Sequence, residues 1–167
     1  GTNNIPCGEY AAAGVVVFNT PGANANAVNE LVIASLLLGS RRLIDAIEWV
    51  RTLKGKGDEI PNLVEKGKAR FAGPEICGKK LGIVGLGAIG AKVANSAVGL
   101  GMEVAGYDPY LSVENAMSLS RQVRRVNDMD TLLADSDYLT FHIPLTDSSR
   151  GMIDRKMISK MKDGVVI

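Results

Sequence analysis

The sequence predicts an α/β fold built on a doubly wound parallel sheet, and two observations lead to this prediction. From Lys80 onward, short apolar segments alternate with longer segments of helical periodicity. A glycine-rich turn, Gly85 to Gly90, stands directly between the first apolar segment and the first helical one. Alternating strands and helices of this kind form a parallel sheet with helices on both faces and right-handed crossovers.

Strands and helices are expected in strict alternation from Lys80 to the last residue. The expected strands span residues 81–84, 104–107, 122–126, 138–142 and 165–167, and the helices between them span 88–100, 112–119, 129–134 and 154–161. The strand segments are short and largely apolar, which is typical of parallel strands that are buried on both faces.

Upstream of Lys80 the pattern is less regular. Residues 1–8 contain Asn, Pro and Gly and are expected to form a loop. The β-branched run Val15 to Phe18 is expected to form a short buried strand, which Pro21 and Gly22 follow. Residues 54–73 are charged and rich in glycine, and we expect a surface connection there.

One long helix is expected from Asn24 or Asn26, either of which is a suitable N-cap, to Leu53. Its apolar residues recur at helical spacing: Val28, Leu31, Val32, Leu36, Leu43, Ile44, Ile47 and Val50. We expect this apolar face to pack in the core or in a dimer. Arg41 and Arg42 are interpreted as a solvated face or a salt-bridged pair rather than a binding patch.

The composition excludes several classes of protein. The chain has 167 residues, of which 46% are hydrophobic and 22% charged, so disorder is not expected. Its 19 basic and 18 acidic residues leave no basic excess for a nucleic acid or an anionic membrane. No apolar run reaches the ~18 residues that span a bilayer. Cys7 and Cys77 form no paired or metal-binding pattern, which favours a reducing, cytoplasmic compartment and no metal site.

The two ends of the sequence suggest a piece of a longer protein. No Met stands at the start, and Val165 to Ile167 resembles a strand that is cut in the middle. We therefore expect a doubly wound fold that is truncated at both ends.

The turn from Gly85 to Gly90 fits the pattern GxGxxG in the context that a dinucleotide fingerprint requires, after a strand and before a helix. Gly85 permits a tight turn, Gly87 lets a pyrophosphate approach the backbone, and Gly90 lets the helix pack on the sheet. The pyrophosphate would bind the free N–H groups at the helix N-terminus. The alternative is a glycine-rich turn that binds nothing. These features predict a Rossmann-like nucleotide-binding fold.

Asp108 ends the second expected strand, about 20 residues after the glycine loop, where the fingerprint places an acidic residue. Its carboxylate can accept hydrogen bonds from the adenosine ribose and would repel a 2′-phosphate. Pro109 and Tyr110 supply no cation for such a phosphate, so NAD is favoured over NADP. The alternative is that Asp108 and Pro109 only begin a turn.

His142 is the only histidine in the chain, and it ends the fourth expected strand. This position lies at the carboxyl edge of the sheet, where ligands bind. No carboxylate is close in sequence to orient the imidazole. We therefore interpret His142 as a wall of a cofactor pocket rather than as a general base.

Several stretches in family order and spacing make the chain resemble the D-isomer-specific 2-hydroxyacid dehydrogenases, and within them the branch that acts on 3-phospho-D-glycerate. The stretches are residues 1–6, 17–24, 30–32, 78–90, 106–110, 142–145 and 161–165. The glycine loop is common to many dehydrogenases. The stretches Asn19 to Asn24 and Tyr107 to Tyr110 are more specific to the phosphoglycerate branch.

The resemblance implies roles for individual residues in NAD binding. Ala88 and Ile89 would contact the pyrophosphate, Asp108 the adenosine ribose, and Tyr107 and Pro109 the adenine. His142, Ile143 and Pro144 would line the adenine side of the pocket, with Thr146 and Ser149 close by. Thr2 would lie near the nicotinamide. The family usually has Thr at the position of Ser149. Asn24 would face the substrate, and the helix from Asn26 would belong to a dimer interface.

The resemblance also implies an activity, NAD-dependent oxidation of 3-phospho-D-glycerate to 3-phosphohydroxypyruvate in serine biosynthesis. The family's catalytic Arg and its Glu–His pair match no residue here, and His142 does not correspond to the catalytic His. Residues 1–22 would be the end of a substrate-binding domain, and 23–167 an NAD-binding domain. We expect the whole protein to be a cytoplasmic homodimer. We expect these 167 residues by themselves to bind NAD without catalysing the reaction.

Three alternatives remain. The first is a related dehydrogenase for lactate, glyoxylate or hydroxypyruvate, because the substrate depends largely on the other domain. The second is an NAD-sensing corepressor on the same fold that binds partner proteins, since fold alone does not define function. The third is a methyltransferase, which also has a glycine loop before an acidic strand end. The GxGxxG spacing and His142 to Pro144 count against the methyltransferase.

Overall fold

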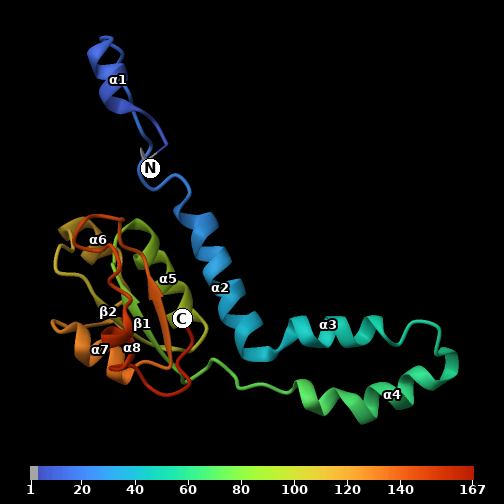
Figure 1. The fold of residues 1–167 in the computed structure, drawn as a ribbon. Coiled ribbons are helices and arrows are strands. Elements are labelled where there is room, and N and C mark those ends of the chain that lie inside the picture. The colour runs from blue at the N-terminus through green and yellow to red at the C-terminus, as the bar shows by residue number, and fades with distance from the viewer. Residues whose placement is uncertain (1–3) are drawn as a thin grey trace.

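The computed structural model describes residues 4–167. Helices and strands alternate over the second half of the chain, as Figure 1 shows. The helices and the two 3₁₀ turns are α1 (Cys7–Ala12), α2 (Ala25–Arg41), α3 (Leu43–Arg51), η1 (Gly57–Glu59), α4 (Ile60–Gly67), η2 (Lys68–Phe71), α5 (Ala88–Gly99), α6 (Val113–Ser118), α7 (Met129–Asp135) and α8 (Arg155–Ile158). The strands are β1 (Lys80–Val84), β2 (Glu103–Tyr107), β3 (Arg124–Arg125) and β4 (Tyr138–Phe141).

The strands form one parallel sheet in the order β3-β2-β1-β4. The chain runs from β1 through β2 to β3 on one side, and then returns to place β4 on the other side of β1. The connections therefore diverge where β1 and β4 end, and a crevice at such a switch point is where ligands bind in open α/β sheets. The predicted doubly wound parallel sheet is confirmed.

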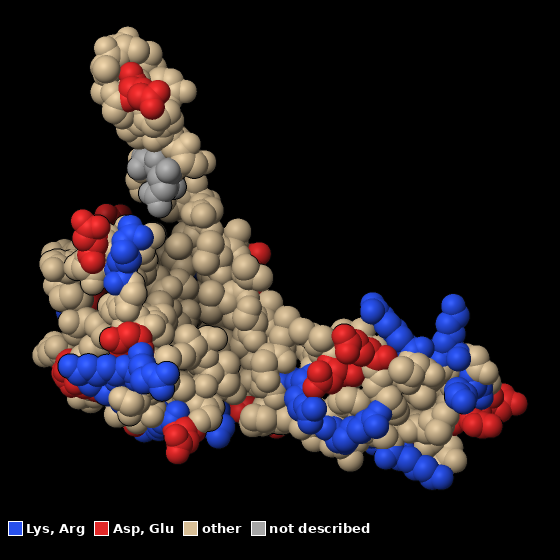
Figure 2. All heavy atoms as spheres, viewed as in Figure 1, with Lys and Arg blue, Asp and Glu red and all other residues tan. Residues whose placement is uncertain are grey.

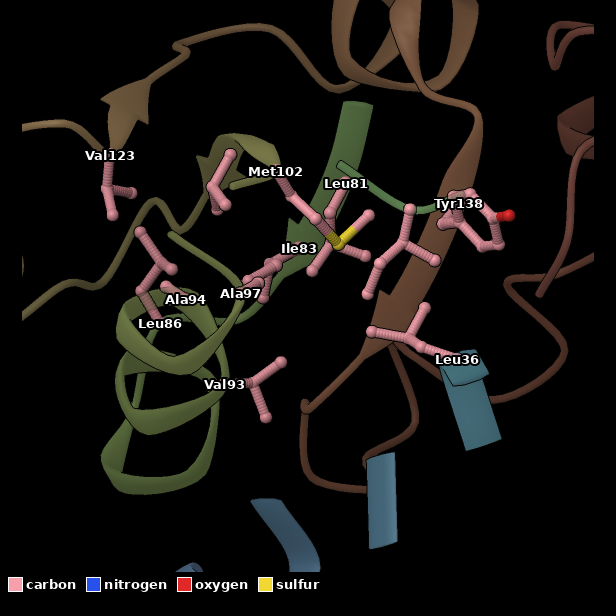
Figure 3. Packing of buried hydrophobic residues seen from close by; sticks show 12 residues of the cluster. Leu36, Leu81, Ile83, Leu86, Val93, Ala94, Ala97, Met102, Val123 and Tyr138 are labelled. Carbon is pink, nitrogen blue, oxygen red and sulfur yellow. The ribbon is translucent and has the colours of Figure 1, made fainter. Parts of the chain in front are cut away.

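Helices cover both faces of the sheet. Successive side chains of β1 point to opposite faces, and they pack against different helices. Leu81 and Ile83 are buried against Val93 of α5 and Leu36 of α2, in the cluster that Figure 3 shows. Val84 lies in a separate cluster with Leu132 of α7. Each fully buried aliphatic side chain of this kind contributes ~1.5–3 kcal/mol to folding.

Helix α2 runs beside α5 in the same direction. At their starts, a Cβ built on Gly22 would lie 3.6 Å from Cβ of Ala88. Further along, Leu36 packs in the same cluster as Ala97 of α5. The N-termini of both helices therefore lie at the carboxyl edge of the sheet, and their positive dipole ends face the same region.

Residues 43–73, which we call the arm, extend away from the sheet (Figure 1). Neither α3 nor α4 contains a buried residue. Four apolar side chains of α3 are between 42% and 59% exposed, namely Leu43, Ile44, Ile47 and Val50, whereas Trp49 is partly buried. Lys and Arg gather toward the end of the arm, whereas the surface over α2 is largely uncharged (Figure 2).

Two predictions for the first half of the chain are wrong. Val15 to Phe18 form no strand, and Val16 and Phe18 are 71% and 86% exposed, because no strand lies beside them to pair with. The single long helix is interrupted at Arg42, whose backbone is left-handed, and it continues as α3. The expected connection over residues 54–73 contains helix α4 and two 3₁₀ turns.

Two predicted strands are shorter than expected. The strand expected over 122–126 is reduced to Arg124–Arg125, because this strand lies at the edge of the sheet and pairs only with β2. The strand expected over 165–167 consists of one bridge between Tyr138 and Val166. This bridge extends the parallel order beyond β4.

Within residues 4–167, none of the helices combines the length and the apolar character needed to cross a membrane.

Candidate functional site

A cavity of about 480 Å³ opens at the carboxyl edge of the sheet, where β1, β2 and β4 end. Its lining combines the glycine loop, the end of β2 and the loop after β4. The lining residues are Val84, Gly85, Gly87, Tyr107, Asp108, Pro109, Tyr110, Ser112, Asn115, Met129, His142, Ile143, Pro144, Thr146, Ser148, Ser149 and Met152. Ten residues predicted from the sequence for the cofactor therefore meet in one cavity: Gly85, Gly87, Tyr107, Asp108, Pro109, His142, Ile143, Pro144, Thr146 and Ser149.

Two glycines of the loop are needed for its shape. Gly85 has a φ of +92°, and a Cβ there would lie 2.6 Å from the carbonyl oxygen of His142. A Cβ on Gly90 would lie 1.9 Å from the carbonyl oxygen of Gly85, so α5 can pack this closely only with glycine. Both positions are fixed by contacts within the protein.

Gly87 is different, because a Cβ there would meet no atom of the protein within 4 Å. The open space beside Gly87 lies at the start of α5, where the N–H groups of Ala88, Ile89 and Gly90 have no carbonyl acceptor within the helix. Such a helix terminus favours a phosphate. The space and the free donors therefore fit the pyrophosphate of a dinucleotide.

Asp108 is held by two backbone amides. Its Oδ2 accepts a hydrogen bond of 2.8 Å from the N–H of Leu86, and its Oδ1 accepts one of 2.8 Å from the N–H of Tyr110. The first bond ties the end of β2 to the glycine loop. Since a carboxylate oxygen has two lone pairs, each oxygen retains acceptor capacity for a ribose hydroxyl. The sequence suggests either a ribose contact or the start of a turn. The bond from Tyr110 forms such a turn, and the link to Leu86 is an additional finding.

His142 ends β4 and is half-buried, and burial lowers the pKa of its imidazole. The ring is therefore neutral at pH 7. Its Nε2 lies 3.0 Å from Oγ1 of Thr140, and no carboxylate hydrogen-bonds to it within residues 4–167. A neutral imidazole without a carboxylate partner fits the interpretation as a pocket wall better than a general base.

The loop after β4 forms the other rim of the cavity. The Ser149 hydroxyl donates a 2.7 Å hydrogen bond to the carbonyl of Pro144 and accepts one of 2.8 Å from the N–H of Thr146. Ser149 thus shapes this loop from within. Ile143 packs with Met152 on the α7 side of the sheet, which gives the cavity an apolar wall.

Four predicted residues are not among the lining residues: Ala88, Ile89 and Gly90, which begin α5, and Asn24. Asn24 is the N-cap of α2, beside the start of α5, and its side chain makes no capping hydrogen bond. Its amide is therefore not used by the helix. Thr2 lies outside the described residues.

Sequence reasoning missed several lining residues: Tyr110, Ser112, Asn115, Met129, Ser148 and Met152. The position of Met129 carries a usable signal, because it begins the helix after the third strand and so lies at the carboxyl edge. Met152 stands in irregular backbone, and no periodicity in the sequence places it. Within residues 4–167, no three His, Cys, Asp or Glu side chains group closely enough to hold a metal ion.

Comparison with protein families agrees with this geometry. Residues 33–167 match the model of the D-isomer specific 2-hydroxyacid dehydrogenase, NAD binding domain. The chain belongs to this family of oxidoreductases, and NAD is its cofactor. The predicted family, the fold and the cofactor are therefore confirmed.

Two relatives align with the chain over its full length. The chain is 37% identical over its full length to the hydroxypyruvate reductase of Thermotoga maritima, of which it covers 49%, and 37% identical to the D-3-phosphoglycerate dehydrogenase of Archaeoglobus fulgidus, of which it covers 29%. The chain thus spans half or less of these relatives.

Solved structures of the same family superpose on the whole chain. D-lactate dehydrogenase from Escherichia coli in its apo form matches with a TM-score of 0.78 and 27% identity, over 100% of this chain and 48% of that one. D-lactate dehydrogenase from Aquifex aeolicus, complexed with NAD and lactic acid, matches with a TM-score of 0.76 and 27% identity, over 99% and 45%.

Proposed function

We propose that this chain is the NAD-binding part of an enzyme that oxidises 3-phospho-D-glycerate to 3-phosphohydroxypyruvate. The proposal rests on the loop Asn19 to Asn24, one of the two stretches, with Tyr107 to Tyr110, that resemble the phosphoglycerate branch more specifically than the glycine loop does. This loop leads to the start of α2, and Gly22 there lies against Ala88 beside the glycine loop. A segment in this place can contact both the cofactor and a substrate. The identity to phosphoglycerate dehydrogenases agrees with this.

The chain's own residues would bind and orient the cofactor. The amides of Ala88 and Ile89 hold the pyrophosphate, Asp108 holds the adenosine ribose, and Tyr107 and Pro109 lie beside the adenine. The remaining predicted residues form the opposite wall: His142, Ile143, Pro144, Thr146 and Ser149. Thr2 is proposed near the nicotinamide. When bound, NAD accepts the hydride, and the protein supplies orientation and electrostatics.

The substrate side of the site is proposed only in outline. The resemblance to the family gives Asn24 a place facing the substrate, and its side chain makes no capping hydrogen bond to α2 that would occupy it. Residues 1–22 belong to a substrate-binding domain and 23–167 to the NAD-binding domain. The family's catalytic Arg and Glu–His pair match no residue of this chain, so these 167 residues alone bind NAD and do not turn over.

A second candidate is the reduction of hydroxypyruvate. The observation in its favour is the hydroxypyruvate reductase of Thermotoga maritima, which is as similar to this chain as the phosphoglycerate dehydrogenase of Archaeoglobus fulgidus. Both reactions use the same cofactor site, so the difference lies in the substrate.

The test is a side-by-side assay of the full-length protein that contains this chain. NADH formation from 3-phospho-D-glycerate is measured against NADH consumption with hydroxypyruvate, glyoxylate and pyruvate. We expect the highest kcat/KM for the phosphoglycerate couple. A kcat/KM that is tenfold higher for hydroxypyruvate would establish the second candidate instead.

We also propose that the protein is a cytoplasmic homodimer that associates through α2 and the arm. Ile44, Ile47 and Val50 expose apolar side chains on α3, and Leu37 and Leu38 do so on α2. Exposed apolar side chains gathered in this way are typical of an interface. Sedimentation of the wild type and of Ile47→Asp tests this, and we expect a dimer that the substitution dissociates. A wild type that stays monomeric at high concentration would contradict the proposal.

A further inference from the structure

The junction between α2 and α3 is the one place in residues 4–167 where a residue other than glycine has a positive φ. Arg42 lies there with φ 48° and ψ 37°, in the left-handed region that L residues avoid. No glycine or proline stands at this position. Apolar residues recur at helical spacing on both sides of it, and the sequence alone favours one continuous helix. The break must therefore be held by contacts elsewhere.

The side chain of Arg42 supplies these contacts. Its Nη2 and Nε donate to Oδ2 of Asp45 at 2.9 and 3.1 Å, and its Nη1 donates to the carbonyl oxygen of Arg70 at 3.1 Å. Asp45 lies in the first turn of α3, where a negative charge is favourable. One guanidinium thus joins the start of the outgoing helix to the end of the returning segment, 28 residues later.

The returning segment is in turn fixed on α3. The guanidinium of Arg70 lies 4.7 Å from the ring centroids of both Trp49 and Phe71, and these two rings are 5.1 Å apart. Farther along, a Cβ on Gly73 would lie 1.9 Å from the carbonyl oxygen of Ser40, so the returning chain crosses the last turn of α2 closely. The contacts of Arg42 thus belong to a point where three segments meet.

We propose that Arg42 is a latch that holds the arm bent, and that releasing it lets α2 and α3 join into one straight helix. The straight form is encoded by the periodicity of the sequence, and the bent form is selected by the bonds to Asp45 and Arg70. The latch thereby sets the direction in which the apolar face of Ile44 and Ile47 points. This inference does not depend on the substrate. Because the proposed homodimer would cover the same arm, the test is carried out in the Ile47→Asp background, in which the chain is expected to be monomeric.

A distance measurement between two spin labels tests the latch. Cys7 and Cys77 are replaced by Ser, and labels are attached to Cys introduced at the exposed positions Ala27 and Lys54. The labelled protein is diluted into an excess of unlabelled protein, so that only distances within one chain are recorded. A continuous helix would separate the two positions by roughly 40 Å, at 1.5 Å per residue. The bent arm gives a shorter distance.

We expect a single narrow distribution below 40 Å for the wild type. Arg42→Ala should broaden the distribution and add a population near 40 Å, and Asp45→Ala, which removes only an ion pair that is about half exposed, should do so to a smaller extent. Arg41→Ala is the matched control, because Arg41 is the exposed neighbour and makes no side-chain hydrogen bond within residues 4–167, so its distribution should equal the wild type.

The latch is overturned if Arg42→Ala and Asp45→Ala keep the wild-type distribution. Should circular dichroism show that Arg42→Ala is unfolded, Asp45→Ala and Arg42→Gln decide the question. Glutamine is a good helix former that lacks the guanidinium, so a longer or broader distribution in Arg42→Gln supports the latch. An unchanged distribution in both variants overturns it.

Discussion

The sheet with its covering helices and the arm are held by different forces. Around β1, side chains such as Ile83, Val93 and Leu132 are completely buried. In the arm, α3 and α4 bury no residue. The contacts there are one buried side chain, Leu53, the guanidinium of Arg42, and an aromatic cluster that includes Arg70. A packed core therefore fixes the cofactor cavity, whereas a few contacts, mostly polar and aromatic, fix the position of the arm.

The largest effect is expected at Gly90. A Cβ in Gly90→Ala would collide with the carbonyl oxygen of Gly85, and the loss of unfolding free energy should be about 3 kcal/mol or more. Urea denaturation measures it. Gly99→Ala is the matched control on the same helix, because a Cβ there meets nothing within 4 Å, and it should leave stability equal or slightly higher. Equal stability of all three proteins would contradict the account of the loop.

Leu132 and Ile47 compare the core with the arm directly. Leu132→Ala removes a completely buried side chain and should lower the free energy of unfolding by roughly 2–5 kcal/mol. Ile47 is 52% exposed, so Ile47→Ala should cost less than about 0.5 kcal/mol in a sample dilute enough to be monomeric. Denaturation at two protein concentrations adds a control, since only the Ile47 effect should grow with concentration. Similar costs at low concentration would show that the arm has a core of its own.

Gly87 separates binding from stability. A Cβ in Gly87→Ala meets no protein atom, but it enters the space that fits the pyrophosphate. We expect unchanged urea stability and an NADH affinity that is lower by about tenfold or more, equivalent to ~1.4 kcal/mol. Unchanged NADH binding would place the pyrophosphate elsewhere.

Acidification should destabilise the protein in two steps. The loss of stability in the first step, near neutral pH, is the smallest of the predicted effects. Burial lowers the pKa of His142 in the folded state below its ordinary value of 6.5. The stability that comes from keeping this ring neutral is present above pH 6.5 and is lost as the pH falls through the pKa of the folded state. Hydrogen bonds from Thr131 and Lys80 lower the pKa of Asp128 and Asp135, and their contributions are lost only below 3.8. His142→Gln should remove the first step from a plot of melting temperature against pH and leave the second. A first step that survives this substitution would assign it to another group.

Much of the sheet could be predicted from the sequence, because there local and global signals agree. The run Leu81 to Val84 has strand propensity and no polar side chain, and Gly85 to Gly90 has a pattern that few structures other than a strand–helix turn allow. The patterns around this loop, Asp108 and His142 predicted part of the cavity lining, whereas the roles of Tyr107, Pro109, Ile143, Pro144, Thr146 and Ser149 followed only from the resemblance to the family.

The rest depends on tertiary contacts that no local pattern contains. Arg42 breaks a helix that is regular in the sequence, because its partners are Asp45 and, 28 residues away, Arg70. Val15 to Phe18 have strand propensity but no strand to pair with. Met152 reaches the cavity from irregular backbone. Each of these positions depends on which segments the tertiary fold brings together.

The most direct test of the central claim is calorimetric titration of the chain with NADH and NADPH, for the wild type and for Asp108→Ala. Asp108 carries the claim, because its carboxylate closes the glycine loop through Leu86 and has acceptor capacity left for the ribose. We predict micromolar NADH binding, on the order of 8 kcal/mol, with much weaker NADPH binding. In folded Asp108→Ala, the affinity for NADH should fall by roughly 10- to 100-fold, and the ratio of NADH affinity to NADPH affinity should decrease. Equal NADH and NADPH affinities in the wild type, or full NADH affinity in the folded variant, would contradict the account.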